Sequence, residues 1–139
     1  MRISLNRINE EYLFECSNEA GNKIVLDNTS QPDAKGVSPM ESLLMAVASC
    51  SAIDIISILK KQRQVIQHFS AEVEGERIPV DEAKPFKNIM VRFYLEGEIS
   101  PEKALKAAQL SFDKYCSVSK TLEPTAEVSF EVFVNKEKA

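Results

Sequence analysis

The sequence is poor in the residues that build phosphate loops and metal sites. It has four glycines, no tryptophan and a single histidine, His68. A phosphate loop uses several closely spaced glycines, and the sequence has no such cluster. Neither a C-x-x-C nor an H-x-x-x-H spacing occurs, so a structural zinc site is not expected. The sequence therefore predicts neither a bound metal nor a phosphate-bearing cofactor.

Cysteine is also scarce, and its number is odd. The chain has three cysteines, Cys16, Cys50 and Cys116, and residues 1–7 lack the apolar stretch of a signal peptide. Both features argue against an extracellular disulfide framework. We therefore expect a cytoplasmic protein, in which a cysteine is either an inert small apolar residue or a reactive thiol.

Positive charge is in deficit, with a formal net charge of −4 and a pI near 5.1. Such a chain lacks the positive field that phosphate backbones require, so we expect no nucleic-acid partner. The most apolar stretch, residues 43–59, is interrupted by Cys50, Asp54 and several serines. It therefore predicts a buried helix and not a membrane span.

The composition fits one globular domain over residues 1–139, with 44% apolar and 27% charged residues. Alternation and turn signals predict strands at residues 3–8, 11–16, 23–27, 67–76, 88–96 and 126–134. Helices are predicted at residues 39–64, 101–114 and 115–122. Because strands and helices are segregated along the chain, we expect an α+β fold with antiparallel sheet.

The first helix has a strong start signal and an unusual surface. Ser38 can cap it, Pro39 suits its first position, and Glu41 completes an S-x-x-E capping box. Residues 43–48 are apolar on every side, so the helix needs cover all round. One chain of this length has little material to surround it, and we therefore expect a homodimer.

Cys50 is the first candidate for chemistry. It lies in the middle of this helix between Ser49 and Ser51, whose hydroxyls could donate hydrogen bonds to a thiolate. Asp54 lies one turn further on the same face, and its carboxylate would disfavour a thiolate unless a cation neutralises it. An inert cysteine packed in a core explains the position equally well on these residues alone.

Cys116 is the second candidate. It stands between Lys114 and Lys120, and nearby cations favour a thiolate. The alternative is again a buried small residue. If Cys50 and Cys116 met in space, oxidation of one to a sulfenic acid would let the other form a disulfide, but their spacing does not show that they meet.

Cys16 and His68 are assigned no chemistry. Cys16 alternates with Phe14 in a predicted edge hairpin, where it fills a core position. His68 begins a strand on the expected solvent face, and no nucleophile with a supporting pattern accompanies it.

Two segments resemble the motifs of the OsmC/Ohr family. The first is GVSPMESLLMAVASCSAID at residues 36–54, a proline-led apolar helix that reaches Cys50 eleven residues after Pro39. The second is YCSVS at residues 115–119, which is similar to the family's second-cysteine segment. The resemblance is closest to the YhfA-like branch. It extends over nearly the whole chain, since the order of strands and helices also fits.

The resemblance implies a fold and an activity. The fold is an intertwined homodimer in which antiparallel sheets wrap the paired central helices, with active sites at the subunit interface. The activity is the reduction of organic hydroperoxides, in which Cys50 becomes a sulfenic acid and Cys116 resolves it as a disulfide. An external dithiol would then reduce the disulfide. No metal, haem or flavin is implied.

The chain departs from the peroxidase branches at two points. Those branches carry a glutamate directly after the proline, where this chain has Met40. Glu41, one position later, would lie ~14 Å from Cys50 along the helix and on its opposite face. Those branches also use an arginine to hold the thiolate, and no arginine here stands in a motif that identifies it. The alternative is a non-enzymatic relative that binds a small apolar ligand at the dimer interface or senses oxidation. The sequence names neither the substrate nor the reductant.

Overall fold

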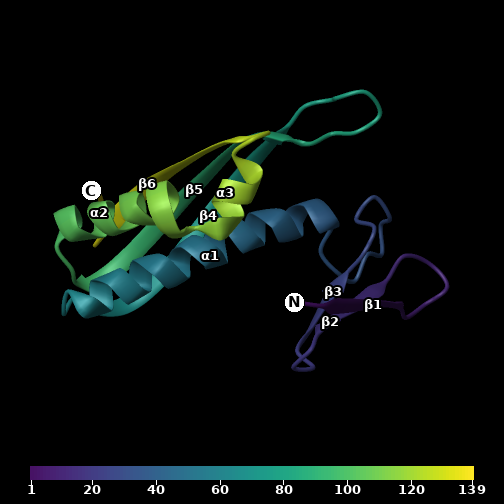
Figure 1. Cartoon of the computed structure of the whole chain (residues 1–139), viewed down its shortest axis with the longest axis horizontal. Helices are drawn as coiled ribbons and strands as arrows, with labels where there is room; N and C mark the ends of the chain where they lie inside the picture. The colour runs from purple at the N-terminus through teal and green to yellow at the C-terminus, as the bar shows by residue number, and fades with distance from the viewer. The chain divides into compact units, whose positions relative to one another are not determined.

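The computed structural model describes residues 1–139, which form two compact units, Met1–Leu43 and Leu44–Ala139. The first unit contains strands β1 (Ile3–Arg7), β2 (Phe14–Asn18) and β3 (Lys23–Leu26) and the start of helix α1 (Pro39–Lys61). The second contains the rest of α1, strands β4 (Val65–Arg77), β5 (Phe86–Glu98), β6 (Glu127–Val134) and β7 (Glu137–Lys138), helices α2 (Pro101–Leu110) and α3 (Ser117–Leu122), and a π-helix, η1 (Ser111–Tyr115) (Figure 1). The order of elements is as predicted, with η1 and β7 added.

The first unit is built on a three-stranded antiparallel sheet in the order β1-β2-β3. Leu5, Cys16 and Ile24 are direct cross-strand partners and therefore share one face of this sheet. Cys16 is half-buried between two aliphatic side chains that are more than half exposed. It lies on the central strand of the sheet, whereas an edge hairpin was predicted.

The segment between β3 and α1 is held by a buried carboxylate and a helix cap. Asp27 accepts the backbone N–H groups of Asn28 at 2.7 Å and Lys35 at 2.8 Å. The N–H of Ser38 donates to Glu41 Oε2 at 2.7 Å, and the N–H of Glu41 donates to Ser38 Oγ at 3.1 Å. These bonds lower the pKa of Glu41. The predicted capping box is thus confirmed, and it fixes where α1 begins.

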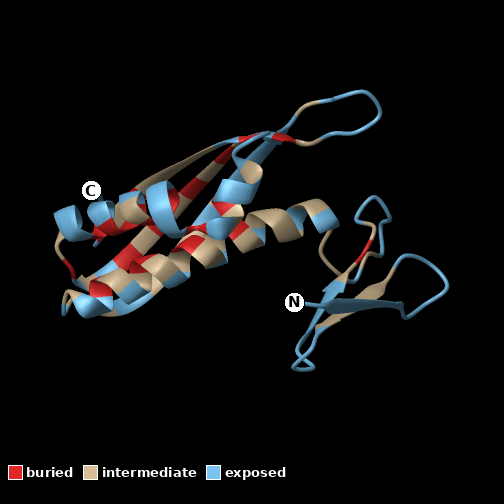
Figure 2. Cartoon of the chain, in the orientation of Figure 1, coloured by how far each residue is buried: buried red, intermediate tan, exposed pale blue.

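The second unit is a four-stranded sheet, β4-β5-β6-β7, with helices on one face (Figure 1). Alternate residues of β5 point toward the helices and are almost completely buried: Ile89, Val91, Phe93 and Leu95 (Figure 2). Their partners on β4 and β6 continue the same apolar face. The predicted alternation of buried and solvent-facing positions is confirmed here.

One pair of strands differs from the expected antiparallel arrangement, because β5 and β6 run parallel. Parallel neighbours need a crossover connection, and residues 99–126 supply it with α2, η1 and α3. Strand alternation reads the same in either direction, so the sequence pattern did not reveal this. The crossover places the helices that carry Cys116 over the buried face of the sheet.

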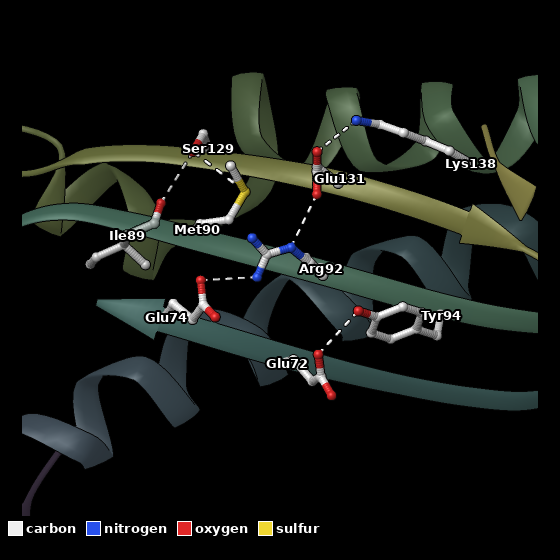
Figure 3. Close-up of polar contacts among 9 residues, drawn as sticks. All are labelled: Glu72, Glu74, Ile89, Met90, Arg92, Tyr94, Ser129, Glu131 and Lys138. Atoms are coloured by element: carbon white, nitrogen blue, oxygen red, sulfur yellow. Dashed lines mark hydrogen bonds and ion pairs between the residues drawn. The ribbon is translucent and has the colours of Figure 1, made fainter. Parts of the chain in front are cut away.

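The outer face of this sheet is polar. Arg92 lies between two glutamates, with Nη1 at 3.0 Å from Glu74 and Nε at 3.1 Å from Glu131 (Figure 3). Lys138 also contacts Glu131, at 2.6 Å, and this contact contributes most to lowering the pKa of that carboxyl. The hydroxyl of Tyr94 donates to a further glutamate on β4. These contacts link all four strands of the sheet on the solvent side, away from the helices.

Helix α1 is buried along one side and open along another. Val47, Ile55 and Leu59 are fully buried, whereas Met45 is 52% and Ile53 66% exposed. By length and mean hydropathy alone, α1 could cross a membrane, but the core helix of a soluble protein has the same composition. The second unit by itself therefore does not supply the complete cover that the sequence predicts for this helix.

Gly97 should be among the least replaceable residues of the sheet. It has φ +137° opposite a bulge in β4, and a Cβ there would lie 2.1 Å from the carbonyl oxygen of Val65. Gly97→Ala should lower the free energy of unfolding by about 2 kcal/mol or more in urea denaturation. Gly21 is the matched control, since it also has positive φ (+86°) but has open space around it. Gly21→Ala should cost only about 1 kcal/mol. Equal losses in the two variants would contradict the steric argument.

Candidate functional site

The two cysteines predicted to carry chemistry are brought together in the second unit. Cys50 and Cys116 are both free thiols, and they lie close enough for Cys50 to contribute to the raised pKa of Cys116. The sequence alone could not show that the two cysteines lie close together, because one lies in α1 and the other lies between η1 and α3. Cys16 belongs to the sheet of the first unit.

Cys50 is half-buried in the middle of α1. The hydroxyls on either side of it are already used by the helix backbone. Ser49 Oγ donates to the Met45 carbonyl at 2.9 Å, and Ser51 Oγ donates to the Val47 carbonyl at 2.6 Å. The expectation that these serines could support a thiolate is therefore wrong for both, since each hydroxyl proton is directed to a backbone oxygen.

Cys116 is fully buried and caps the start of α3, where its sulfur accepts the N–H of Ser119 at 3.4 Å. Burial raises the pKa of the Cys116 thiol, and this effect outweighs the hydrogen bonds from Ser119, which act to lower it. On the basis of the flanking lysines, the sequence predicted a lowered pKa for the Cys116 thiol. Lys114 is exposed, and the ammonium of Lys120 contacts Glu123 at 3.1 Å. Desolvation, not neighbouring charge, decides the state of this thiol.

The neighbouring thiol acts on Cys116 in the same direction as burial. Interaction with Cys50 raises the pKa of Cys116 further, so Cys116 favours its protonated form. Since Cys50 is also the more exposed of the two, the arrangement suits an outer nucleophile backed by an inner thiol.

A serine that the sequence did not identify connects the elements that carry the thiols. Ser111 Oγ donates to Asp54 Oδ2 at 2.8 Å, one helical turn after Cys50. The carbonyl of Ser111 accepts the N–H of Cys116 at 2.7 Å in the π-helical turn. A serine within a predicted helix gives no signal of such a role, and i→i+5 bonding cannot be read from a 3.6-residue pattern.

The other titratable candidates are engaged or exposed elsewhere. Glu41 is held by Ser38 in the helix cap, and Arg92 lies between glutamates on the outer face of the sheet. His68 is exposed, as predicted. No group of three or more histidine, cysteine, aspartate or glutamate side chains is arranged to hold a metal ion.

The two thiols should differ in their rate of alkylation. Cys116 is buried and has a raised pKa, so at pH 7 to 8 a smaller fraction of it is thiolate and less of it is accessible. Brief treatment with iodoacetamide should label Cys50 well before Cys116, and labelling of Cys116 should rise only at more alkaline pH. Peptide mass mapping measures both sites, with full labelling in denaturant as the control. Faster labelling of Cys116 would contradict this description.

Comparison with known proteins places these features in a family. Residues 32–131 match the family model described as OsmC-like protein. Protein YhfA of Escherichia coli strain K12 is 36% identical over 126 residues, which cover 88% of this chain and 92% of YhfA.

Solved structures show the same fold. A hypothetical protein from Aquifex aeolicus VF5 has a TM-score of 0.80 and 29% identity, covering 96% of both chains. The organic hydroperoxide resistance protein OhrB of Bacillus subtilis has a TM-score of 0.65 at 15% identity, covering 95% of this chain and 96% of OhrB. At that identity the likeness concerns the fold alone. The family model and the match to YhfA show the family as well as the fold, and this chain belongs to the OsmC-like protein family.

Proposed function

We propose that the chain reduces organic hydroperoxides through the thiols of Cys50 and Cys116. The observation that carries this proposal is the proximity of two free thiols of unequal exposure. A half-buried sulfur can meet a substrate, whereas a fully buried one can react only with its neighbour. Membership of a family that includes organic hydroperoxide resistance proteins agrees with a redox role.

The proposed reaction has two steps on the protein. The Cys50 thiolate attacks the distal oxygen of ROOH, the O–O bond breaks, and ROH leaves with one proton while Cys50 becomes a sulfenic acid. The sulfur of Cys116 then attacks the sulfenic sulfur, and water leaves as the disulfide forms. The S–H proton of Cys116 and the hydroxyl of the sulfenic acid make up that water. Peroxide has gained two electrons and the thiol pair has lost them.

A third step must restore the thiols. An external dithiol attacks the disulfide, passes through a mixed disulfide, and leaves with its own sulfurs joined. The proposal requires this reductant because the two cysteines supply electrons for only one turnover. No metal or organic cofactor is needed for any of the three steps.

A second candidate is an oxidation sensor with the same two thiols but slow turnover. It is favoured by the positions of the arginines. Arg7 binds the backbone carbonyls of Glu10 and Glu11, Arg77 binds that of Lys84, and Arg92 binds glutamates on the outer sheet face. These three arginines are engaged by groups other than Cys50. If no other cation reaches Cys50, attack on peroxide is slow, although the disulfide can still form.

We further propose that residues 1–139 form one OsmC-like domain that works as a cytoplasmic homodimer. The support is the side of α1 that one chain leaves open, around Met45 and Ile53. Covering aliphatic side chains stabilises an assembly by about 25 cal/mol for each Å² of apolar surface removed from water. Members of the family are typically dimeric, which agrees with this assembly. A small apolar ligand could share such an interface.

Turnover with cumene hydroperoxide and dihydrolipoamide tests the peroxidase. The protein should consume peroxide catalytically, and Cys50→Ser should abolish consumption. Cys116→Ser should stop after about one equivalent and leave a sulfenic acid that dimedone traps. Cys16→Ser is the control and should retain wild-type rates. Disulfide formation over minutes, without turnover, would favour the sensor, and no reaction of Cys50 would exclude both candidates.

The assembly has its own test. Ile53→Arg places a charge in the middle of the open side of α1, where burial in an interface would be costly. Native mass spectrometry should show a dimer for the wild type and a monomer for Ile53→Arg. Val80→Arg is the matched control, because Val80 is 51% exposed in the loop between β4 and β5 and should leave the dimer intact. A monomeric wild-type protein would contradict the proposal.

A further inference from the structure

We propose that Ser111 and Asp54 are a positioning pair that sets how readily Cys50 and Cys116 join in a disulfide. The inference rests on the proposed function for its choice of thiols, and it adds Ser111, to which no motif of the sequence pointed. Neither Ser111 nor Asp54 is assigned contact with a substrate. Their role is to hold the segment that carries one thiol against the helix that carries the other.

Ser111 ties three elements together through all of its polar groups. Its backbone N–H donates to the carbonyls of Ala107 and Ala108 in α2. Its carbonyl accepts the N–H of Cys116 at 2.7 Å, and its hydroxyl donates to Asp54 of α1 at 2.8 Å. Ser111 is fully buried and Asp54 is half-buried, so solvent can compete for the bond between them only from the side of Asp54.

The next residue anchors the same turn to the sheet. The ring of Phe112 stacks on that of Phe130 of β6, with ring centroids 4.9 Å apart. It also packs in a tilted arrangement against the ring of Phe93 of β5, with ring centroids 6.2 Å apart. This packing fixes η1 over the sheet, while the hydroxyl of Ser111 fixes it to α1. Two anchors in different directions leave the turn little freedom to slide along the helix.

The connection between the thiols is short. Asp54 lies one turn after Cys50 on the same helix face, and Cys116 is one backbone hydrogen bond from Ser111. The bond between Asp54 and Ser111 therefore links the helix that carries Cys50 directly to the segment that carries Cys116. Opening it would let the Cys116 segment move relative to α1. The thiols would then spend less time in a geometry that forms a disulfide.

The equilibrium between the thiol pair and glutathione measures how readily Cys50 and Cys116 form a disulfide, and it requires no peroxide. One glutathione disulfide takes two electrons from Cys50 and Cys116, which become a disulfide, and two glutathione thiols are released with both protons. Full-length protein carrying Cys16→Ser keeps only the two thiols of interest. Mass spectrometry after acid quench gives the oxidised fraction in buffers of graded glutathione ratio, and hence the equilibrium constant.

Ser111→Ala and Asp54→Ala should each lower this equilibrium constant roughly tenfold, as expected for the loss of one buried hydrogen bond to a charged group. Asp54→Asn should stay close to wild type, because its amide oxygen can still accept the hydroxyl of Ser111. The double variant, Ser111→Ala with Asp54→Ala, should fall no further than either single variant, because both remove the same bond.

Ser51→Ala separates positioning from general destabilisation. It removes another buried hydroxyl bond on α1, to the Val47 carbonyl, and should lower the melting temperature without changing the equilibrium constant. An unchanged constant in Ser111→Ala, or an equal fall in Ser51→Ala, would overturn the positioning pair, as would failure of the parent protein to form the disulfide at all. A normal disulfide equilibrium in a protein that does not consume peroxide would reject the peroxidase and leave the pair standing.

Discussion

The burial of the Cys116 thiol against α1 is the constraint on which the site depends. Burial raises the pKa of this thiol, so a disulfide with Cys50 depends on a backbone that keeps the two sulfurs together. The parallel crossover from β5 to β6 supplies that backbone, since it carries α2, η1 and α3 across the same sheet face that α1 covers. The aromatic contacts of Phe112 and the bonds of Ser111 then fix the position of Cys116 along α1.

The different surroundings of the two thiols separate their chemical roles. Cys116 is shielded from solvent and receives its hydrogen bond from the backbone of Ser119, so it is unsuited to meet an oxidant directly. Cys50 is more open and has the S–H of Cys116 beside it. Under the proposed function, burial thus distinguishes the attacking thiol from the resolving thiol, even with Met40 where the peroxidase branches have a glutamate.

Much of this arrangement could be predicted from sequence, because it rests on local patterns. The alternation in β5, the cap formed by Ser38 and Glu41, and the two cysteine motifs depend on residues near each other in the chain. Strand direction, the π-turn and the bond from Ser111 to Asp54 depend on distant segments packing together, and no short spacing encodes them. The pKa of Cys116 was predicted in the wrong direction for the same reason, since its lysines are adjacent in sequence but burial is decided by the fold.

The position of Cys50 around α1 connects the redox site to the proposed assembly. Val47, Ile55 and Leu59 mark the buried side of the helix, and Met45 and Ile53 mark the open side. At 3.6 residues per turn, Cys50 lies on the boundary between these two sides. Its sulfur can therefore contact Cys116 from the buried side while it remains accessible from the open one. A second copy that covered the open side would border this sulfur directly. The same burial that stabilises such a dimer would then form one wall of the substrate site, which is why the assembly and the chemistry should be lost together in Ile53→Arg.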